Sequence, residues 1–312
     1  MSQKIATRTA YGAALVQLGR ENPNVVVLDA DLAKSTKTAD FGKVFPERFF
    51  DLGIAEQNMI GTAAGLAAAG KLPFCSTFAV FASGRAFEQV RNSVAYSGLN
   101  VKIGASHAGI TVGADGGSHQ AVLDLALMRA LPGMTVFVPA DAVETAGAVR
   151  AAAALRGPVY IRLGRTDVPV LHGPGFQFEP GRAVVLREGG DAAILATGLM
   201  VSAALEAAEL LAGEGTEVEV LDIHTIKPLD VEAVVAAAKK TGALITAEEH
   251  SIIGGLGSAV AETLAENHPV IMKRIGIPDK FGESGSPEEL LEHFRLTPAW
   301  IAAAVKETIA RK

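Results

Sequence analysis

The sequence contains little cysteine, few aromatic residues and no block of basic residues. Its single cysteine, Cys75, excludes an internal disulfide and is typical of a protein from a reducing compartment. A formal net charge of -6 and the lack of a basic run argue against a nucleic-acid partner. No apolar run approaches the ~18 residues of a membrane span, and the first residues lack the apolar core of a signal peptide. We therefore expect a cytoplasmic protein with neither a membrane nor a nucleic-acid partner.

Apolar residues, in contrast, are abundant. The 312 residues are 49% apolar and 20% charged, which predicts a large core and enough chain for two domains of roughly 150 residues each. Strand-like and helix-like segments alternate, as in α/β domains whose helices cover both faces of a mainly parallel sheet. A stretch rich in Pro and Gly, 169–185, predicts a linker between domains at 1–168 and 186–312. The expected fold is thus two three-layer α/β domains.

The expected elements follow from the apolar pattern. The predicted strands are Val25–Asp29, Phe49–Leu52, Pro73–Phe78, Val101–Ala105, Thr135–Val138, Val159–Leu163, Ala192–Thr197, Glu217–Asp222, Ala243–Ala247 and Val270–Ile275. The predicted helices are Arg8–Glu21, Asn58–Ala69, Gly84–Tyr96, Gln120–Ala130, Val143–Leu155, Leu199–Ala212, Val231–Lys239, Leu256–Glu266 and Pro298–Ala310.

One carboxylate, Glu56, lies at the junction between a predicted strand and a predicted helix, in the segment Asp51-Leu-Gly-Ile-Ala-Glu-Gln-Asn58. Open α/β sheets bind their ligands at this carboxyl edge. Burial there would favour the protonated carboxyl, which could bond to a ring nitrogen, as the aminopyrimidine of thiamine diphosphate requires. The pattern alone also fits a Glu that is stabilised by the dipole at a helix N-terminus.

Two further groups follow predicted strands. Phe78 and Phe81 are spaced to place two rings on one face, suited either to a flat heteroaromatic base or to the core. The Gly-rich stretch from His107 to His119 also holds Asp115 and predicts a loop whose backbone approaches another group closely. A metal site is the alternative for these three polar residues, but their spacing matches no zinc pattern, so we predict no metal ligand in this chain. Imidazoles and a carboxylate suit hydroxyl recognition and proton transfer.

Arginines form the fourth group. Arg8 lies near the N-terminus, and Arg162 and Arg165 follow the last strand of the first half. An arginine at the carboxyl end of a strand is well placed to meet an anion. Solvated surface is the alternative interpretation for each of them.

With these groups in place, nearly the whole chain resembles the C-terminal half of a transketolase, and most closely the separate C-terminal subunit of a split, two-chain transketolase. The most specific matches are Asp51–Asn58, Ser76–Arg91 and His107–Gln120. The second half, with Asp222-Ile-His-Thr-Ile-Lys-Pro-Leu229, resembles the C-terminal domain of that family. The resemblance implies a pyrimidine-binding domain followed by a transketolase C-terminal domain.

The resemblance also implies roles for the cofactor-binding residues. Glu56 is similar to the glutamate that activates thiamine diphosphate, and Phe78 and Phe81 match the aromatic pocket of its aminopyrimidine ring. Asp31 matches a carboxylate beside the thiamine at the subunit interface. Many full-length transketolases have a tyrosine where this chain has Gly84, and Arg85 follows at once, as in related thiamine enzymes. The far side of the pyrimidine pocket is therefore expected to differ.

The substrate residues are implied in the same way. His107 and His119 match histidines that line the substrate channel and move protons, and Asp115 matches the aspartate that reads the C2 hydroxyl of the donor. The residues that match the family's sugar-phosphate site are Arg8, Ser35, His107 and Arg165.

A motif that thiamine diphosphate enzymes require is missing from the sequence. They use Gly-Asp-Gly, followed about thirty residues later by Asn, to hold the metal ion of the diphosphate; the nearest strings here, Ala114-Asp-Gly-Gly117 and Gly189-Gly-Asp191, do not match it. The resemblance therefore implies a partner subunit that carries the diphosphate-binding domain and its Mg²⁺ or Ca²⁺. An α₂β₂ assembly, with the cofactor shared across the interface, is expected.

The expected function is transfer of a two-carbon ketol unit from a ketose phosphate to an aldose phosphate, as in the pentose phosphate pathway. Three alternatives share the chemistry: a split transketolase of a specialised sugar pathway, the β subunit of a 2-oxoacid dehydrogenase E1, and an enzyme similar to deoxyxylulose-phosphate synthase. A non-catalytic homologue is a fourth. A nicotinamide-binding enzyme is a fifth, although Gly254-Gly-Leu-Gly257 is only part of the glycine fingerprint.

Overall fold

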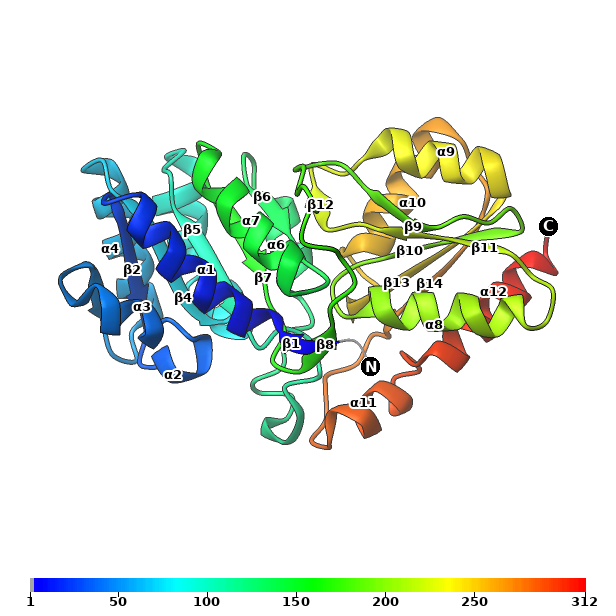
Figure 1. Ribbon diagram of the computed structural model, residues 1–312, viewed down its shortest axis with the longest axis horizontal. Coiled ribbons are helices and arrows are strands. Elements are labelled where there is room, and N and C mark those ends of the chain that lie inside the picture. The colour runs from blue at the N-terminus through cyan, green and yellow to red at the C-terminus, as the bar shows by residue number, and fades with distance from the viewer. Residues whose placement is uncertain (1–2) are drawn as a thin grey trace.

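The computed structural model describes residues 3–312 as two α/β domains that lie side by side (Figure 1). The first half of the chain, blue to green, forms one domain around a seven-stranded sheet, and most of the second half, yellow to red, surrounds a five-stranded sheet. A short two-stranded ribbon of β1 (Lys4–Ala6) and β8 (Asp167–Pro169) lies between them. No helix among the described residues combines the length and apolar composition that crossing a bilayer requires.

The larger sheet is parallel except at one edge. Its strands, in spatial order, are β12 (Thr225–Lys227), β6 (Thr135–Phe137), β7 (Val159–Arg162), β5 (Lys102–Ser106), β4 (Leu72–Phe78), β2 (Val25–Asp29) and β3 (Phe49–Asp51). Only the β12–β6 pair is antiparallel. The central strands β2 and β4 are buried throughout and mainly apolar because both faces of the sheet are covered by helices.

Side-chain alternation on β2 shows how the two faces are filled. Val25 and Val27 pack into the cluster that α1 and α7 cover, whereas Val26 and Leu28 pack into the cluster that α4 covers. The helical segments of this domain are α1 (Thr7–Glu21), α2 (Ala33–Thr36), α3 (Ala39–Val44), η1 (Pro46–Arg48), α4 (Glu56–Ala68), η2 (Phe81–Arg85), α5 (Phe87–Gln89), η3 (Val90–Tyr96), η4 (Gly113–Asp115), α6 (Asp124–Ala130) and α7 (Ala142–Ala154).

The smaller sheet has the order β14 (Ile271–Ile277), β13 (Ala243–Ser251), β10 (Ala192–Ala196), β11 (Val218–Asp222) and β9 (Val184–Arg187), and only β9 is antiparallel to its neighbour. Its helices are α8 (Met200–Ala212), α9 (Val231–Thr241), α10 (Leu256–Asn267), α11 (Pro287–His293) and α12 (Pro298–Ile309). α8 and α12 cover one face, while α9 and α10 cover the other.

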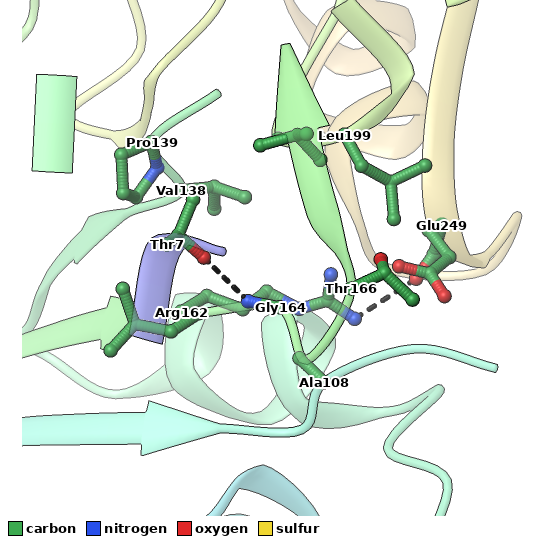
Figure 2. Close-up of a pocket in the computed structure, with 12 residues that line it drawn as sticks. Thr7, Ala108, Val138, Pro139, Arg162, Gly164, Thr166, Leu199 and Glu249 are labelled. Atoms are coloured by element: carbon green, nitrogen blue, oxygen red, sulfur yellow. Dashed lines mark hydrogen bonds between the residues drawn. The ribbon is translucent and has the colours of Figure 1, made fainter. Parts of the chain in front are cut away.

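Three features join the domains. Strand β12, which comes from the second half of the sequence, pairs with β6 and so extends the sheet of the first domain. One apolar cluster continues from Leu28 and Ile103 to Leu195 and Leu244 without a break. A small cavity at the junction is lined by residues of both domains, among them Arg162 and Glu249, whose backbone oxygen accepts a hydrogen bond from Arg162 (Figure 2). The contact between the two domains, called the seam below, is therefore part of the apolar core.

The expected fold class is confirmed, and the element bounds differ most where tertiary contacts intervene. Strand Val25–Asp29 matches its prediction, and most other ends shift by one or two residues. The predicted helix Gly84–Tyr96 is replaced by η2, α5 and η3, in which η2 and η3 are π-helical. β13 runs to Ser251 rather than Ala247 because its end lies against β14. The sequence pattern predicted none of the short strands β1, β8, β9 and β12.

Candidate active site

The candidate residues meet at the carboxyl edge of the larger sheet. Strand β2 lies between β3 and β4, so the chain crosses in opposite directions on either side of β2, the kind of position at which α/β sheets bind ligands. Asp31 follows β2, Glu56 follows β3, Phe78 ends β4, and His107 follows β5. The topology thus brings together groups that are far apart in the sequence.

Glu56 is buried at the start of α4 and is paired with Arg85. One guanidinium nitrogen, Nη1, lies 2.8 and 2.9 Å from the two carboxylate oxygens of Glu56. Glu56 is 1% exposed, whereas the side chain of Arg85 remains 47% exposed. Within this chain, the arginine provides the counter-charge that a buried carboxylate requires. The expected burial of Glu56 is thus present, and the ion pair was not anticipated from the sequence.

Aromatic rings form a column beside this pair. The rings of Phe78 and Phe81 stack with their centroids 5.8 Å apart and their planes 10° apart, and the His107 ring stacks on Phe78 at 3.8 Å. Arg85 lies 4.4 Å above the Phe81 ring. The π-helical turn creates this arrangement, since the Ala86 amide bonds to the Phe81 carbonyl five residues back.

Gly84 lies in the same turn, and a Cβ added there would have no neighbouring atom within 4 Å. A larger side chain would therefore fit at this position. Phe281, from the second domain, is 84% exposed and lines a shared pocket with Gly84 and Gly117. The far side of the aromatic column is consequently open in this chain.

His107 is a buried, neutral imidazole. Its Nδ1 lies 2.9 Å from the Ser106 hydroxyl, and its Nε2 lies 3.4 Å from Arg8 Nη1. Because an arginine can only donate, Nε2 accepts and Nδ1 carries the proton. Burial, together with the positive charges of Arg8 and Arg165, lowers the pKa of His107 to about 3. A neutral ring in this tautomer can orient a hydroxyl but holds no spare proton near neutral pH.

The glycine-rich loop after His107 packs against the second domain. A Cβ at Gly116 would lie 2.4 Å from the Ser284 hydroxyl, and one at Gly109 would lie 2.1 Å from the Glu249 carboxyl carbon. Gln120 donates to the Glu283 carbonyl at 2.8 Å. The close approach expected from the glycines is therefore to another part of the same chain, which holds the loop in place.

The anion-binding candidates divide into two groups. Arg8 and Arg165 line one shallow pocket, and Arg8 also donates to the backbone carbonyl of Ser35 at 2.9 Å. Burial and the positive charge of Arg165 lower the pKa of Arg8. Two neighbouring guanidiniums repel each other, so an anion between them is favoured.

Arg162 does not join this pocket. It is 6% exposed, and its Nε lies 2.8 Å from Asp124 Oδ2 within the seam between the domains. Its Nη2 donates to the backbone carbonyls of Ala121 and Glu249. The anion that Arg162 contacts is therefore the carboxylate of Asp124 and not a ligand. The bond of Arg162 to Glu249 links the first domain to the second.

The remaining candidates lie at the rim. Asp31 and Asp115 are exposed, and His119 is partly exposed with its ring edge against Phe81 at 5.6 Å. Asp31 has a positive φ of 61°, and its amide donates to Asp51 Oδ1 at 3.0 Å, which fixes the loop after β2. Sequence reasoning missed the residue that organises this loop. Asp29 accepts bonds from Leu32, Thr36 and Thr38, and no motif around it indicates that role.

Comparisons with known proteins match both domains. Residues 3–170 match the family described as transketolase, pyrimidine binding domain, and residues 181–301 match transketolase, C-terminal domain. A putative transketolase C-terminal section from Methanocaldococcus jannaschii is 49% identical over 308 residues, which cover 98% of this chain and 96% of that protein.

The chain belongs to the transketolase family. The 6-deoxy-6-sulfo-D-fructose transketolase subunit SqwH of Clostridium sp. is also 49% identical, over 98% of this chain and 95% of that subunit. Among solved structures, one described as a split gene transketolase, inactive beta4 tetramer, is 57% identical, with a TM-score of 0.91 and 99% of both chains covered. The family and its fold confirm the resemblance seen in the sequence.

Membership of the transketolase family implies dependence on thiamine diphosphate. The chain's own residues fit one half of that cofactor. A buried carboxylate, Glu56, adjoins a column of stacked rings whose outer side is open at Gly84. This combination suits a flat nitrogen heterocycle better than it suits a diphosphate, for which the edge offers no Gly-Asp-Gly loop.

Proposed function

We propose that this chain is the catalytic half of a two-chain transketolase and moves a two-carbon ketol unit from a ketose phosphate to an aldose phosphate. The observation that carries the proposal is the position of buried Glu56 beside the Phe78–Phe81 column, on the same sheet edge as Arg8 and Arg165. A buried carboxyl that can bond to a ring nitrogen, a platform for a ring and an anion pocket are what ketol transfer between sugar phosphates requires.

Each residue has a distinct task in this mechanism. Bound thiamine diphosphate would supply a nucleophilic carbon and an electron sink for the ketol unit. Glu56 would hold a proton at a ring nitrogen of the aminopyrimidine, and Phe78 and Phe81 would provide the aromatic surface for that ring. Arg85 is paired with Glu56 within this chain and would have to release that carboxyl when the ring binds.

Substrate recognition uses the other groups at the edge. Arg8 and Arg165 clamp the terminal phosphate, which positions the reacting carbon, with the Ser35 segment held beside them by Arg8. Neutral His107 orients hydroxyls, and Asp115 reads the hydroxyl on C2 of the donor. His119, at the mouth of the pocket, transfers protons as the sugar bonds break and form.

A partner subunit completes the site in this proposal. The sequence holds no Gly-Asp-Gly motif for the diphosphate, so the partner is expected to carry that domain and its Mg²⁺ or Ca²⁺. Apolar residues are exposed around the edge: Ile54, two residues before Glu56, is 77% exposed and Phe281 is 84% exposed. We infer that the partner covers these two side chains. The similar split-gene structure is described as an inactive beta4 tetramer. An α₂β₂ assembly is the arrangement we expect.

A specialised sugar pathway is the second candidate, because a relative 49% identical is named for 6-deoxy-6-sulfo-D-fructose. A sulfonate, like a phosphate, is a tetrahedral anion that Arg8 and Arg165 can bind by paired hydrogen bonds. The same anion pocket argues against a 2-oxoacid dehydrogenase E1, whose substrate lacks a terminal phosphate.

A coupled ketol-transfer assay tests the proposal. The chain is assayed with thiamine diphosphate and Mg²⁺, alone and co-expressed with a diphosphate-domain subunit, using xylulose 5-phosphate or 6-deoxy-6-sulfofructose as donor and an aldose phosphate as acceptor. Activity only in the mixture supports the two-chain enzyme, and the preferred donor decides between the candidates. Activity of this chain alone would contradict the need for a partner. An assembled complex that binds cofactor but is inactive with both donors would contradict the ketol-transfer proposal.

A further inference from the structure

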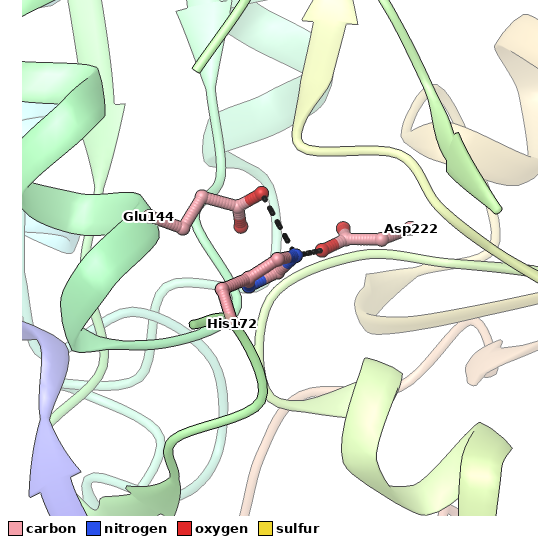
Figure 3. A group of neighbouring side chains, drawn as sticks. All are labelled: Glu144, His172 and Asp222. Atoms are coloured by element: carbon pink, nitrogen blue, oxygen red, sulfur yellow. Dashed lines mark ion pairs between the residues drawn. The ribbon is translucent and has the colours of Figure 1, made fainter. Parts of the chain in front are cut away.

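Three titratable side chains from separate segments meet at the buried seam between the domains, away from the candidate active site (Figure 3). Glu144 comes from α7 of the first domain, His172 from the segment between β8 and β9, and Asp222 from the end of β11 in the second domain. Glu144 and Asp222 have no exposed surface, and His172 is 7% exposed. His172 Nε2 lies 3.7 Å from Asp222 Oδ2 and 4.0 Å from Glu144 Oε1.

The atoms that face one another in this cluster lack hydrogen-bond partners. Among the described residues, the buried atoms without a partner include Glu144 Oε1, His172 Nε2 and both carboxylate oxygens of Asp222. Burying such atoms unpaired is costly, and native proteins satisfy nearly all of them. Their donor atoms all lie within 4.8 Å of one another. A single cation between them would satisfy all three side chains.

The surroundings of the cluster fix the orientation of its donors. Asp141 Oδ2 lies 3.2 Å from His172 Nδ1 and also accepts the His172 backbone amide at 2.8 Å. Hydrogen bonding of Nδ1 to this carboxylate leaves Nε2 facing the cluster. Glu144 Oε2 accepts the Ala140 amide at 2.5 Å, which leaves Oε1 directed at the same point. Histidines that bind metals are usually held by a carboxylate in this way.

The distances fit a transition-metal ion. Ligand atoms about 2.0–2.2 Å from a tetrahedral zinc lie roughly 3.3–3.6 Å apart, so the separations of 3.7 and 4.0 Å from His172 Nε2 would have to close by roughly 0.1–0.7 Å. One imidazole and two carboxylates form a ligand set that zinc and related divalent ions use. We propose that Glu144, His172 and Asp222 bind a divalent transition-metal ion of the Zn²⁺ type that clamps the two domains together.

Metal ligands must be deprotonated to bind, so binding of a divalent ion releases any protons that the three side chains hold and can be measured in this way. The proposed ion is distinct from the metal of the diphosphate, which we assign to the partner.

Metal content of the full chain tests the proposal. The chain is stripped with a chelator under mild denaturation, refolded with an equimolar amount of Zn²⁺, desalted and analysed for zinc by mass spectrometry. We expect one zinc per chain and a higher melting temperature than that of the metal-free chain. Asp222→Asn and His172→Gln retain size and shape and should lose the zinc, whereas His293→Gln, which removes an exposed histidine 3.5 Å from Glu283, should retain it.

Second measurements keep the test decisive if a variant does not fold. Zn²⁺ binding to the wild-type chain should release protons into a weakly buffered solution, and Co²⁺ should give the strong visible absorption of tetrahedral coordination. Asp141→Asn, which keeps a helix-capping side chain, should weaken Zn²⁺ affinity roughly 10–100-fold. Wild-type chain that retains no zinc and releases no protons would overturn the proposal. Zinc that persists in Asp222→Asn or His172→Gln, or that is lost in His293→Gln, would also overturn it.

Discussion

The open edge of the larger sheet and the closed seam between the domains both gather charged groups, yet the two regions place them in opposite surroundings. At the edge, Arg85 stays 47% exposed, and Asp31 and Asp115 face solvent. At the seam, Asp124 and Asp222 have no exposed surface. Charges at the edge are free to meet a ligand or a partner, whereas those at the seam must be compensated within the chain. The first arrangement suits chemistry and the second suits assembly of the domains.

The largest effect we expect comes from Glu56→Gln at the edge. In the assembled complex, this change should lower kcat/KM for ketol transfer roughly 10²–10⁴-fold, because Gln cannot exchange a proton with the ring nitrogen. The melting temperature of the chain should change little, since the side chain keeps its shape. Glu88→Gln, on the exposed surface, is the matched control. Unchanged activity in Glu56→Gln with intact cofactor binding would remove this residue from the chemistry.

At the seam, Arg162→Met should affect stability. Without its guanidinium, buried Asp124 is left uncompensated, and we expect the free energy of unfolding to fall by about 3–5 kcal/mol. Urea unfolding followed by circular dichroism measures this change. Lys306→Met, which breaks an exposed pair with Glu214, should cost no more than about 1 kcal/mol. If both variants lost the same amount, the contrast between the buried seam and the exposed surface would fail.

Arg165→Met should affect substrate binding at the edge. Losing one charge-assisted hydrogen bond of about 1.5–3 kcal/mol should raise KM for a phosphorylated acceptor roughly 10–100-fold. KM for an acceptor without phosphate, such as glycolaldehyde, should stay near the wild-type value. Arg91→Met, an exposed change on η3, is the control. An equal rise for both acceptors would show that Arg165 has no part in recognising the phosphate.

The smallest expected effect is the absence of a titration at His107. With its pKa lowered to about 3, its ring signals should stay constant from about pH 5 to 9 in nuclear magnetic resonance spectra of the histidine-labelled chain. His107→Asn assigns the signal. At pH values between the folded pKa and the ordinary pKa of histidine, the unfolded chain binds more protons than the folded chain. The free energy of unfolding should therefore fall as the pH drops through that range. An inflection near neutral pH would contradict a buried neutral ring.

Much of the candidate site was predictable because its residues follow strands directly. Glu56 and His107 lie just after predicted strands, and parallel strands bring their carboxyl ends to one edge. The pairing of Glu56 with Arg85 was not predictable, since a π-helical turn replaces the expected helix start. Arg162 could not be distinguished from Arg165 by pattern, because only their burial differs.

By itself, the sequence determined the alternation of strands and helices, the placement of reactive groups after strands and the resemblance to the transketolase family. These features are local, since they depend on apolar periodicity and on short motifs. Only the tertiary structure decided that β12 joins the sheet of the first domain, that Arg162 neutralises Asp124, and that Glu144, His172 and Asp222 converge. Each of these three contacts joins residues that are distant in the chain. They meet only because burial of one continuous apolar core holds the two domains in contact.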